Sequence, residues 1–242
     1  MHPWTLFKRG LMGFWYWYVR KLNMRWPAIT IEGRTLAIHP GVYKPIENEQ
    51  ACAAYCRPGD RVLDLGCGSG IGAIFCAGQA REVVAVDISP AAVRNTKENC
   101  ERLGIANVSV AQSDMFANVE GQFDLILANP PYIAADFADD EAQFATSVRY
   151  LPILFAEVHR YLAPGGRLLV QFPIWFKPKI VGLAERHGLS VRRVEPLPGK
   201  SLKLQLLSLA YLQVGFRSTF YLIEPQAVPQ EAGPATPASQ AA

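Results

Sequence analysis

Several residue patterns that would fix the class of a protein are missing from this chain of 242 residues. Its five cysteines include no C-x-x-C pair and are odd in number, which argues against a disulfide framework and a four-cysteine zinc site. None of its four histidines has the H-x-x-x-H spacing of a helical zinc site, so we expect no metal ion. No uncharged apolar run reaches the ~20 residues that a membrane-spanning helix needs. These absences favour a cytoplasmic protein that crosses no membrane.

The net charge of +3 is unevenly distributed along the chain. Residues 1–44 hold seven Lys and Arg against one Glu, a balance of +6, which leaves −3 for the rest of the chain. A stable grip on duplex DNA normally needs many phosphate contacts and therefore a basic surface, which a body of this charge lacks. We therefore divide the chain into a basic N-terminal appendage, residues 1–44, and a mildly acidic main body.

The appendage begins with a predicted helix at about residues 4–23. Its large apolar side chains recur at helical spacing: Trp4, Phe7, Leu11, Phe14, Trp15, Tyr18 and Leu22. The bulky aromatic residues and the lack of a small-residue cleavage site argue against a signal peptide. Three roles stay open for the helix: docking on its own domain, which we favour, binding a partner, or lying on a membrane surface. Alternating apolar and polar residues then predict a hairpin at residues 28–39.

The main body, residues 45–224, alternates between predicted strands and helices. Seven strands are expected at residues 61–65, 82–87, 107–112, 123–128, 166–172, 190–196 and 218–224. Helices are expected at about residues 47–56, 70–79, 89–103, 147–162, 176–187 and 202–214. This alternation predicts a doubly wound, parallel α/β sheet, in which ligands bind at the carboxyl ends of the strands. The Pro-, Ala- and Gln-rich residues 225–242 have little to bury, so we predict a disordered tail.

A glycine-rich loop joins the first of the parallel strands to its helix. Gly66, Gly68 and Gly70 follow Asp64, and glycine lets a backbone turn tightly and approach a ligand closely. Cys67 is small enough to pack within the loop. A nicotinamide fingerprint leaves Asp64 and Gly66 without a role, and the loop lacks the lysine of a P-loop.

Two acidic residues extend this pattern to the next strands. Asp87 ends the second of the parallel strands, where a carboxylate can accept both ribose hydroxyls of an adenosine. Asp114 follows the third and can accept from an adenine amino group, with Ile88 and Met115 on either side of the ring. Together with the glycine loop, these residues predict a site for a nucleoside cofactor.

The fourth parallel strand ends in Asn129-Pro130-Pro131-Tyr132, the most specific motif of the chain. Two prolines remove two backbone donors, so the loop presents carbonyl groups without competing N–H groups. The side-chain carbonyl of Asn129 and the backbone carbonyl of Pro130 can accept the two hydrogens of a planar NH₂ group. The ring of Tyr132 supplies a face for a flat amide or base. We therefore predict that these residues orient an acceptor nitrogen.

The combined motifs resemble those of class I S-adenosylmethionine-dependent methyltransferases. The register Asp64-x-Gly66-x-Gly68-x-Gly70 is similar to their first motif, and Asn129–Tyr132 is similar to the fourth motif of enzymes acting on adenine N6, guanine N2 or glutamine amides. The resemblance implies a seven-stranded, Rossmann-like sheet and S-adenosyl-L-methionine as the cofactor. The cofactor contacts that it implies are Asp64, Gly66, Cys67, Gly68, Gly70, Asp87, Ile88, Asp114, Met115 and Asn129.

Residues 41–49 narrow the resemblance to the HemK-type protein glutamine methyltransferases, whose V-Y-x-P-x-E-D segment they resemble. By this likeness Tyr43 and Pro45 would border the cofactor and the substrate amide, and Glu47 or Glu49 would cap that edge. The likeness implies a protein glutamine as the methyl acceptor.

The chain also departs from the release-factor enzymes of this family. Residues 133–146 lack their glycine-rich element, and an aromatic helix and a hairpin stand where those enzymes have a five-helix domain. Two alternatives to a protein glutamine therefore stay open: an amino group of an RNA or DNA base, or a small molecule. A third alternative is a non-catalytic interaction module on a methyltransferase fold.

Overall fold

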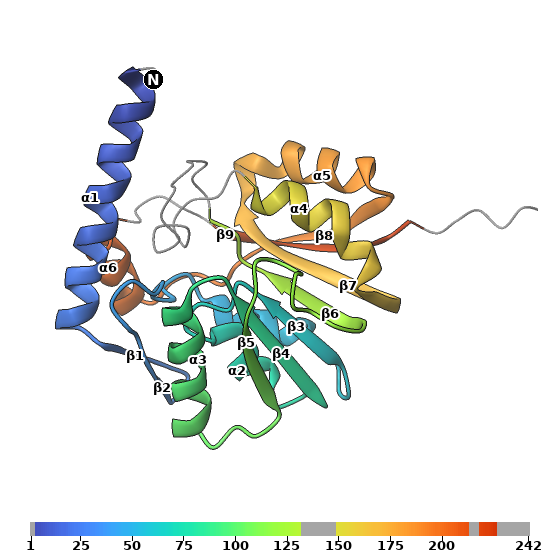
Figure 1. Ribbon diagram of the computed structural model, residues 1–242, viewed down its shortest axis with the longest axis horizontal. Coiled ribbons are helices and arrows are strands. Elements are labelled where there is room, and N and C mark those ends of the chain that lie inside the picture. Colours follow the sequence, from blue (N-terminus) through green and yellow to red (C-terminus); the bar gives the residue numbers. More distant parts are fainter. Residues whose placement is uncertain (1–2, 132–148, 213–217, 227–242) are drawn as a thin grey trace, which may run out of the picture.

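The computed structural model describes residues 3–131, 149–212 and 218–226, with the backbone alone for residues 3–9 and 12. The appendage consists of one long helix and two short strands: α1 (Pro3–Arg25), β1 (Ala28–Ile31) and β2 (Arg34–Ala37). The two strands pair antiparallel around Glu32 and Gly33, so the predicted hairpin is confirmed. Figure 1 shows α1 standing at one end of the molecule.

The body contains the seven predicted strands, each within a few residues of its expected bounds. They are β3 (Arg61–Leu65), β4 (Glu82–Asp87), β5 (Val108–Gln112), β6 (Phe123–Ala128), β7 (Leu162–Pro173), β8 (Leu189–Pro196) and β9 (Ser218–Pro225). The helices that connect them are α2 (Ile71–Cys76), α3 (Pro90–Arg102), α4 (Tyr150–Glu157), α5 (Lys177–Arg186) and α6 (Leu202–Ala210). Three 3₁₀ helices complete the described body: η1 (Glu49–Tyr55), η3 (Val158–Arg160) and η4 (Ile174–Phe176).

The seven strands form one sheet in the order β5-β4-β3-β6-β7-β9-β8, which confirms the predicted doubly wound, seven-stranded fold. The first five strands of this order are parallel, whereas β9 lies antiparallel between β7 and β8. The prediction of a wholly parallel sheet is thus wrong at one end. Alternation of strands and helices cannot reveal this insertion, because hydrophobic periodicity carries no information about the direction in which a strand pairs.

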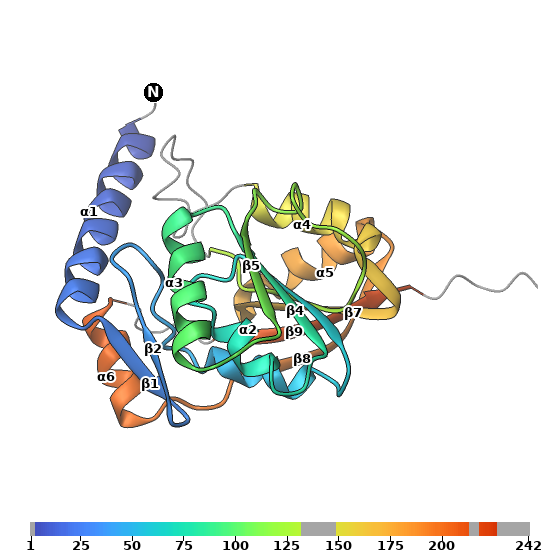
Figure 2. The same ribbon diagram turned by 60° about the horizontal axis from the view of Figure 1, so that its bottom comes forward.

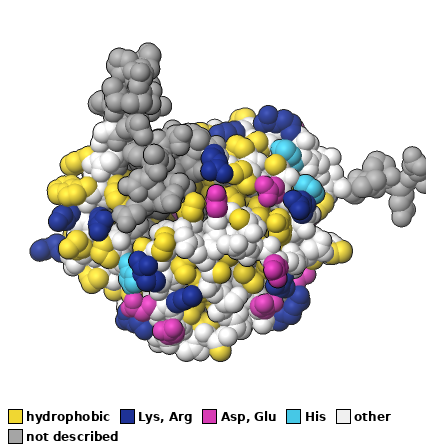
Figure 3. Space-filling model, viewed as in Figure 1, with side chains coloured by type: hydrophobic (Ala, Val, Ile, Leu, Met, Phe, Trp, Pro, Cys, Tyr) yellow, Lys and Arg dark blue, Asp and Glu magenta, His cyan; other side chains and the backbone are white. Residues whose placement is uncertain are grey.

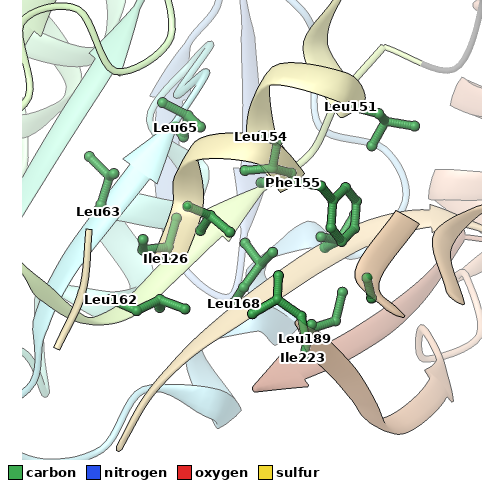
Figure 4. Close-up of a cluster of buried hydrophobic side chains, with 14 of the residues drawn as sticks. Leu63, Leu65, Ile126, Leu151, Leu154, Phe155, Leu162, Leu168, Leu189 and Ile223 are labelled. Carbon is green, nitrogen blue, oxygen red and sulfur yellow. The ribbon is translucent and has the colours of Figure 1, made fainter. Parts of the chain in front are cut away.

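Successive side chains of each strand supply the two faces of the sheet. On one face, Leu63, Leu65 and Ile126 are buried with Leu154 and Phe155 of α4, as Figure 4 shows. On the other face, strand residues such as Val62 and Val83 pack against α2 and η1. Figure 2 separates these two groups of helices on either side of the sheet. The core therefore consists of two apolar layers that hold the strand ends in fixed positions.

A third apolar cluster joins the appendage to the body. Val19 of α1 is 2% exposed and shares this cluster with the hairpin, with α2 and with Tyr211 after α6. The Trp15 indole N–H donates to the Tyr211 carbonyl at 3.1 Å, and the Tyr18 hydroxyl donates to the Ala210 carbonyl at 2.9 Å. The buried Asn23 donates to the Val42 carbonyl and accepts from the Tyr211 hydroxyl. One face of α1 therefore docks on the chain's own body.

Candidate active site

The carboxyl ends of β4, β3 and β6 lie side by side at one edge of the sheet. Leu65, at the end of β3, is in register with Val86 of β4 on one side and with Ala128 of β6 on the other. The glycine loop after β3 therefore emerges between Asp87, which follows Val86 on β4, and Asn129, which follows Ala128 of β6. Three motifs far apart in the sequence are brought together by the sheet register alone.

Two positions of the loop, 68 and 70, require glycine for different structural reasons. Gly68 has φ +57°, and a Cβ built there meets no atom within 4 Å, so the backbone is open to a ligand on that side. Gly70 has φ +84°, and a Cβ there would lie 2.8 Å from the Cγ2 atom of Thr96 on α3. Gly68 thus leaves space, whereas Gly70 permits close packing between the loop and α3.

Asp64 lies beneath the loop and is directed toward α2. Its buried carboxylate accepts a hydrogen bond of 2.8 Å from the Ala73 N–H in the first turn of α2. Burial raises the pKa of the Asp64 carboxyl to about 7, and the neighbouring Asp87 carboxylate adds to this rise. The contact ties the first acid of the motif to the start of the helix.

Asp87 fixes the loop from the adjacent strand. One of its carboxylate oxygens accepts from the Gly68 N–H at 2.9 Å, and the other accepts from the Ser89 N–H at 2.9 Å. Burial raises the pKa of this carboxyl, while the N–H donors act in the opposite direction. Because each carboxylate oxygen can accept more than one hydrogen bond, both can still receive a hydroxyl from a ligand.

Asp114 and its neighbours lie at the rim of this edge. The Asp114 side chain is 51% exposed and faces Arg149 at 3.7 Å. Met115 has φ +51° and packs partly buried against the apolar layer under α4. The Ile88 carbonyl accepts from the Gln112 side-chain amide at 3.0 Å, which links the ends of β4 and β5. The third acid is therefore more open to solvent than the first two.

Tyr150, which the motif analysis missed, covers the glycine loop. Its hydroxyl donates to the Leu65 carbonyl at 2.6 Å, and its ring lies 3.5 Å from the position of a Cβ on Gly66. Burial raises the pKa of this phenol well above its usual value. Tyr150 opens α4 far from the loop in sequence, and no residue pattern signals the contact. Together with the Arg149–Asp114 pair, it brings the start of α4 across the site.

The Asn129-Pro130-Pro131 segment follows β6 at the same edge. Pro130 is buried, and Asn129 and Pro131 are partly buried. Tyr132, the last residue of the motif, lies outside the described residues, as does the segment 133–146. The structure therefore places the first three residues of the motif beside the glycine loop.

Residues 41–49 form a buried loop whose polar groups face inward. The Tyr43 hydroxyl donates to the Glu49 carboxylate at 2.9 Å, and the Glu47 N–H donates to the other carboxylate oxygen at 2.8 Å. Burial raises the pKa of the Glu49 carboxyl to about 7. The Glu47 carboxylate pairs with Lys200, between β8 and α6. Pro45 is also buried. Of the two acids that were expected to cap a substrate edge, Glu49 holds the loop together internally and Glu47 ties it to the body.

The helix expected at residues 47–56 is also corrected. It is a 3₁₀ helix, η1, preceded by Asn48 in the left-handed region with φ +67°. The Asn48 side-chain amide donates to the Pro198 and Gly199 carbonyls at 2.9 and 3.1 Å. This anchoring delays the start of the helix by two residues, since a left-handed residue cannot belong to a right-handed helix.

Within the described ranges, no group of three or more His, Cys, Asp or Glu side chains is arranged to hold a metal ion. Over the same ranges, no helix combines the length and apolar character needed to cross a membrane. All five cysteines are buried and unpaired by disulfides. Cys67 contacts the Thr96 hydroxyl at 3.4 Å, consistent with packing inside the loop.

Comparisons with known proteins agree with this geometry. Residues 51–172 match the family model of the methyltransferase small domain. The chain is 44% identical over 151 residues to a protein named as an N5-glutamine methyltransferase of Methanocaldococcus jannaschii, covering 57% of this chain and 75% of the relative. It is 37% identical over 175 residues to the release factor glutamine methyltransferase of Cereibacter sphaeroides, covering 64% and 61%.

A relative with another substrate in its name is also similar. The chain is 31% identical over 170 residues to ribosomal RNA small subunit methyltransferase C of Chromohalobacter salexigens, covering 63% of this chain and 47% of the relative. The chain thus spans less than two thirds of the length of this relative and of the release factor enzyme.

Solved structures share the fold. A methyltransferase from Pyrococcus furiosus superposes with a TM-score of 0.60 at 18% identity, covering 89% of this chain and 98% of that one. A ribosomal protein L11 methylase from Lactobacillus delbrueckii subsp. bulgaricus gives a TM-score of 0.56 at 22% identity, covering 78% and 84%. With the family match and the glycine loop between two acids, these findings show that the chain belongs to the methyltransferase small domain family and is a methyltransferase with a HemK-type, class I core.

Proposed function

We propose that this methyltransferase transfers a methyl group from S-adenosylmethionine to the side-chain amide nitrogen of a protein glutamine. The observation that carries the proposal is that Asp87, which accepts from the Gly68 N–H, and the Asn129-Pro130-Pro131 segment lie at the ends of the two strands that flank β3. Residues 45–224 would form the catalytic domain and residues 1–44 an appendage packed on it.

The loop fits the cofactor by its open backbone and its acids. The space above Gly68 admits a ligand laid against the loop, and Asp87 has the acceptor capacity for two ribose hydroxyls. Gly66, Cys67 and Gly70 would shape the same cradle, and Asp64 would support it from beneath. Ile88, Asp114 and Met115 would border the adenine.

The acceptor side rests on carbonyl groups rather than on a base. S-adenosylmethionine would supply a methyl group on a sulfonium sulfur, which leaves as a neutral thioether when the amide nitrogen takes the methyl group. The methylated nitrogen would lose one proton to solvent. The Asn129 side-chain carbonyl and the Pro130 backbone carbonyl would accept hydrogen bonds from the two N–H groups of a planar amide. Pro131 would keep the loop rigid. Holding the nitrogen in line can lower a barrier by up to about 7–11 kcal/mol. Tyr132 would provide the stacking face, with Tyr43 and Pro45 at the substrate edge.

A glutamine acceptor is favoured over a nucleic-acid base by two observations. The two most similar of the relatives described above carry glutamine methyltransferase names, at 44% and 37% identity. The body outside residues 1–44 has a net charge of −3, which suits a protein better than a phosphate backbone. The ribosomal RNA relative makes a base amino group the second candidate.

The test is transfer of labelled methyl from S-adenosylmethionine into a host lysate, separated into protein, RNA, DNA, lipid and small-molecule fractions. The wild-type protein and Asn129→Ala are compared. Because Asn129→Ala removes an orienting acceptor but spares the Asp87 contact, we expect the variant still to bind the cofactor, with a loss of turnover of about 100-fold or more that exceeds any loss of cofactor affinity. Label in protein, mapped by mass spectrometry to N-methylglutamine, is the expected result.

Other fractions decide between the candidates. Label in RNA or DNA would identify a base amino group, and not a protein glutamine, as the acceptor. Label in the small-molecule or lipid fraction would exclude both of these acceptors. Undiminished turnover by Asn129→Ala would contradict the orienting role. Cofactor binding without label in any fraction would favour a non-catalytic interaction module.

A further inference from the structure

The face of α1 opposite its docked face exposes several large apolar side chains. Phe14, Trp17 and Met24 lie on it and are 55%, 54% and 59% exposed, although Val19 on the other side is almost fully buried. Phe14 and Trp17 are one helical turn apart, with ring centroids separated by 6.0 Å. Both Figure 1 and Figure 2 show the N-terminal turns of α1 extending beyond the ribbon of the body.

Helix α6, which contacts α1, has a second exposed apolar stripe. Leu202, Leu206 and Leu209 recur at helical spacing and are 72%, 58% and 58% exposed, while Ser208 on the opposite side is buried. Leu212, two residues after the end of the helix, is 54% exposed. A helix with leucines on its solvent side as well as on its packed side is not explained by docking on its own domain.

The charges around these stripes have one sign. Neither α1 nor α6 contains Asp or Glu, whereas α1 carries five Lys and Arg and α6 carries Lys203. Arg20 and Lys21 lie beside Tyr16, Trp17 and Met24 on the open surface of α1. In Figure 3, hydrophobic and basic side chains gather at the edge where Figure 1 places α1 and α6.

We propose that α1 and α6 dock the protein on the surface of an anionic phospholipid bilayer. Aromatic and aliphatic side chains enter the boundary between head groups and acyl chains, and the Lys and Arg head groups contact lipid phosphates. Charge selects this partner: a helix of 23 residues without an acid complements a uniformly negative surface. The helix lies along the surface, in keeping with the lack of a spanning helix in the described parts of the chain.

The test is co-sedimentation of the full chain with vesicles of equal parts phosphatidylglycerol and phosphatidylcholine, compared with pure phosphatidylcholine. We expect the wild type to pellet with the anionic vesicles and to be released by high salt. The double variant Phe14→Ser/Trp17→Ser should lower the vesicle partition coefficient by about tenfold or more. Leu206→Ser/Leu209→Ser should lower it independently, which tests the contribution of α6.

Trp175→Ser is the matched control, because Trp175 is 53% exposed but lies in η4, outside the proposed surface. It should pellet like the wild type, and circular dichroism should show that every variant is folded. Wild type that stays in the supernatant, or equal losses by Trp175→Ser and the α1 variant, would overturn the proposal. So would a dimer of the wild type that Phe14→Ser/Trp17→Ser abolishes, since the occupant would then be a second copy of the chain. Methyl transfer in solution is measured separately and tests only the proposed function.

Discussion

The Asp87 side chain joins the end of β4 to the glycine loop, because its carboxylate accepts from the Gly68 N–H. Replacing this single residue gives the most direct prediction. Asp87→Ala removes the acceptor of the Gly68 N–H and the proposed acceptor of two ribose hydroxyls. We expect a loss of cofactor affinity of about 1–3 kcal/mol by calorimetry, the range of a charge-assisted hydrogen bond.

Glu82→Ala is the matched control, because this acid lies at the other end of β4 and pairs with Arg61 on the surface. Its affinity for the cofactor should equal that of the wild type. Equal affinities for Asp87→Ala and Glu82→Ala would refute the ribose contact. Sequence reasoning located Asp87 because its position at a strand end follows from periodicity, whereas the inward direction of Asp64 depends on where α2 begins.

At the scale of elements, Tyr150 joins α4 to the end of β3. Tyr150→Phe keeps the ring against Gly66 but leaves the Leu65 carbonyl without its donor. We expect a decrease in the free energy of unfolding of about 0.5–1.5 kcal/mol, measured by urea titration. Tyr161→Phe is the control, since its hydroxyl lies at 3.5 Å from the Phe116 carbonyl, the limit of a hydrogen bond. An equally large decrease in the free energy of unfolding of Tyr161→Phe would mean that the hydrogen bond from Tyr150 to the Leu65 carbonyl adds no particular stability.

Most elements were predictable from the sequence, and the exceptions have identifiable causes. β3, β4 and β6 have the predicted bounds because apolar residues fill both of their faces. A helix was expected at residues 47–56, but its late start and its 3₁₀ form go with the left-handed Asn48, whose bonds to Pro198 and Gly199 are tertiary contacts. The Tyr150 contact was missed for the same reason, because it joins the start of α4 to the end of β3, which is far away in sequence.

At the scale of the whole molecule, two buried carboxyl groups make stability depend on pH. Burial raises the pKa of both Glu49 and Asp64 to about 7. Because the folded-state pKa exceeds the unfolded value, each group contributes its stability at low pH and loses it as pH rises through about 7. We expect the wild type to be less stable at pH 8 than at pH 5.5, by about 2 kcal/mol for each group.

Glu49→Gln should reduce this difference, because an amide does not ionise. Urea titrations at both pH values measure it, and Glu82→Gln, at an exposed surface pair, should leave the difference unchanged. A pH dependence of stability that is the same in wild type and Glu49→Gln would mean that Glu49 in the loop at residues 41–49 does not cause it.

The boundary of the appendage at residue 44 stays a prediction. The apolar cluster that contains Val19, α2 and Tyr211 links the appendage to the body.

The antiparallel insertion of β9 also affects how the chain is made. β8 pairs with β9, and β9 in turn pairs with β7, so the far end of the sheet depends on residues 218–225. During synthesis on a ribosome, β7 and β8 emerge first, and the backbone N–H and C=O groups along their edges lack partners until that last segment is translated. The nascent chain therefore completes its sheet only after residues 218–225 have been synthesised, and a chaperone that shields strand edges would act in this interval.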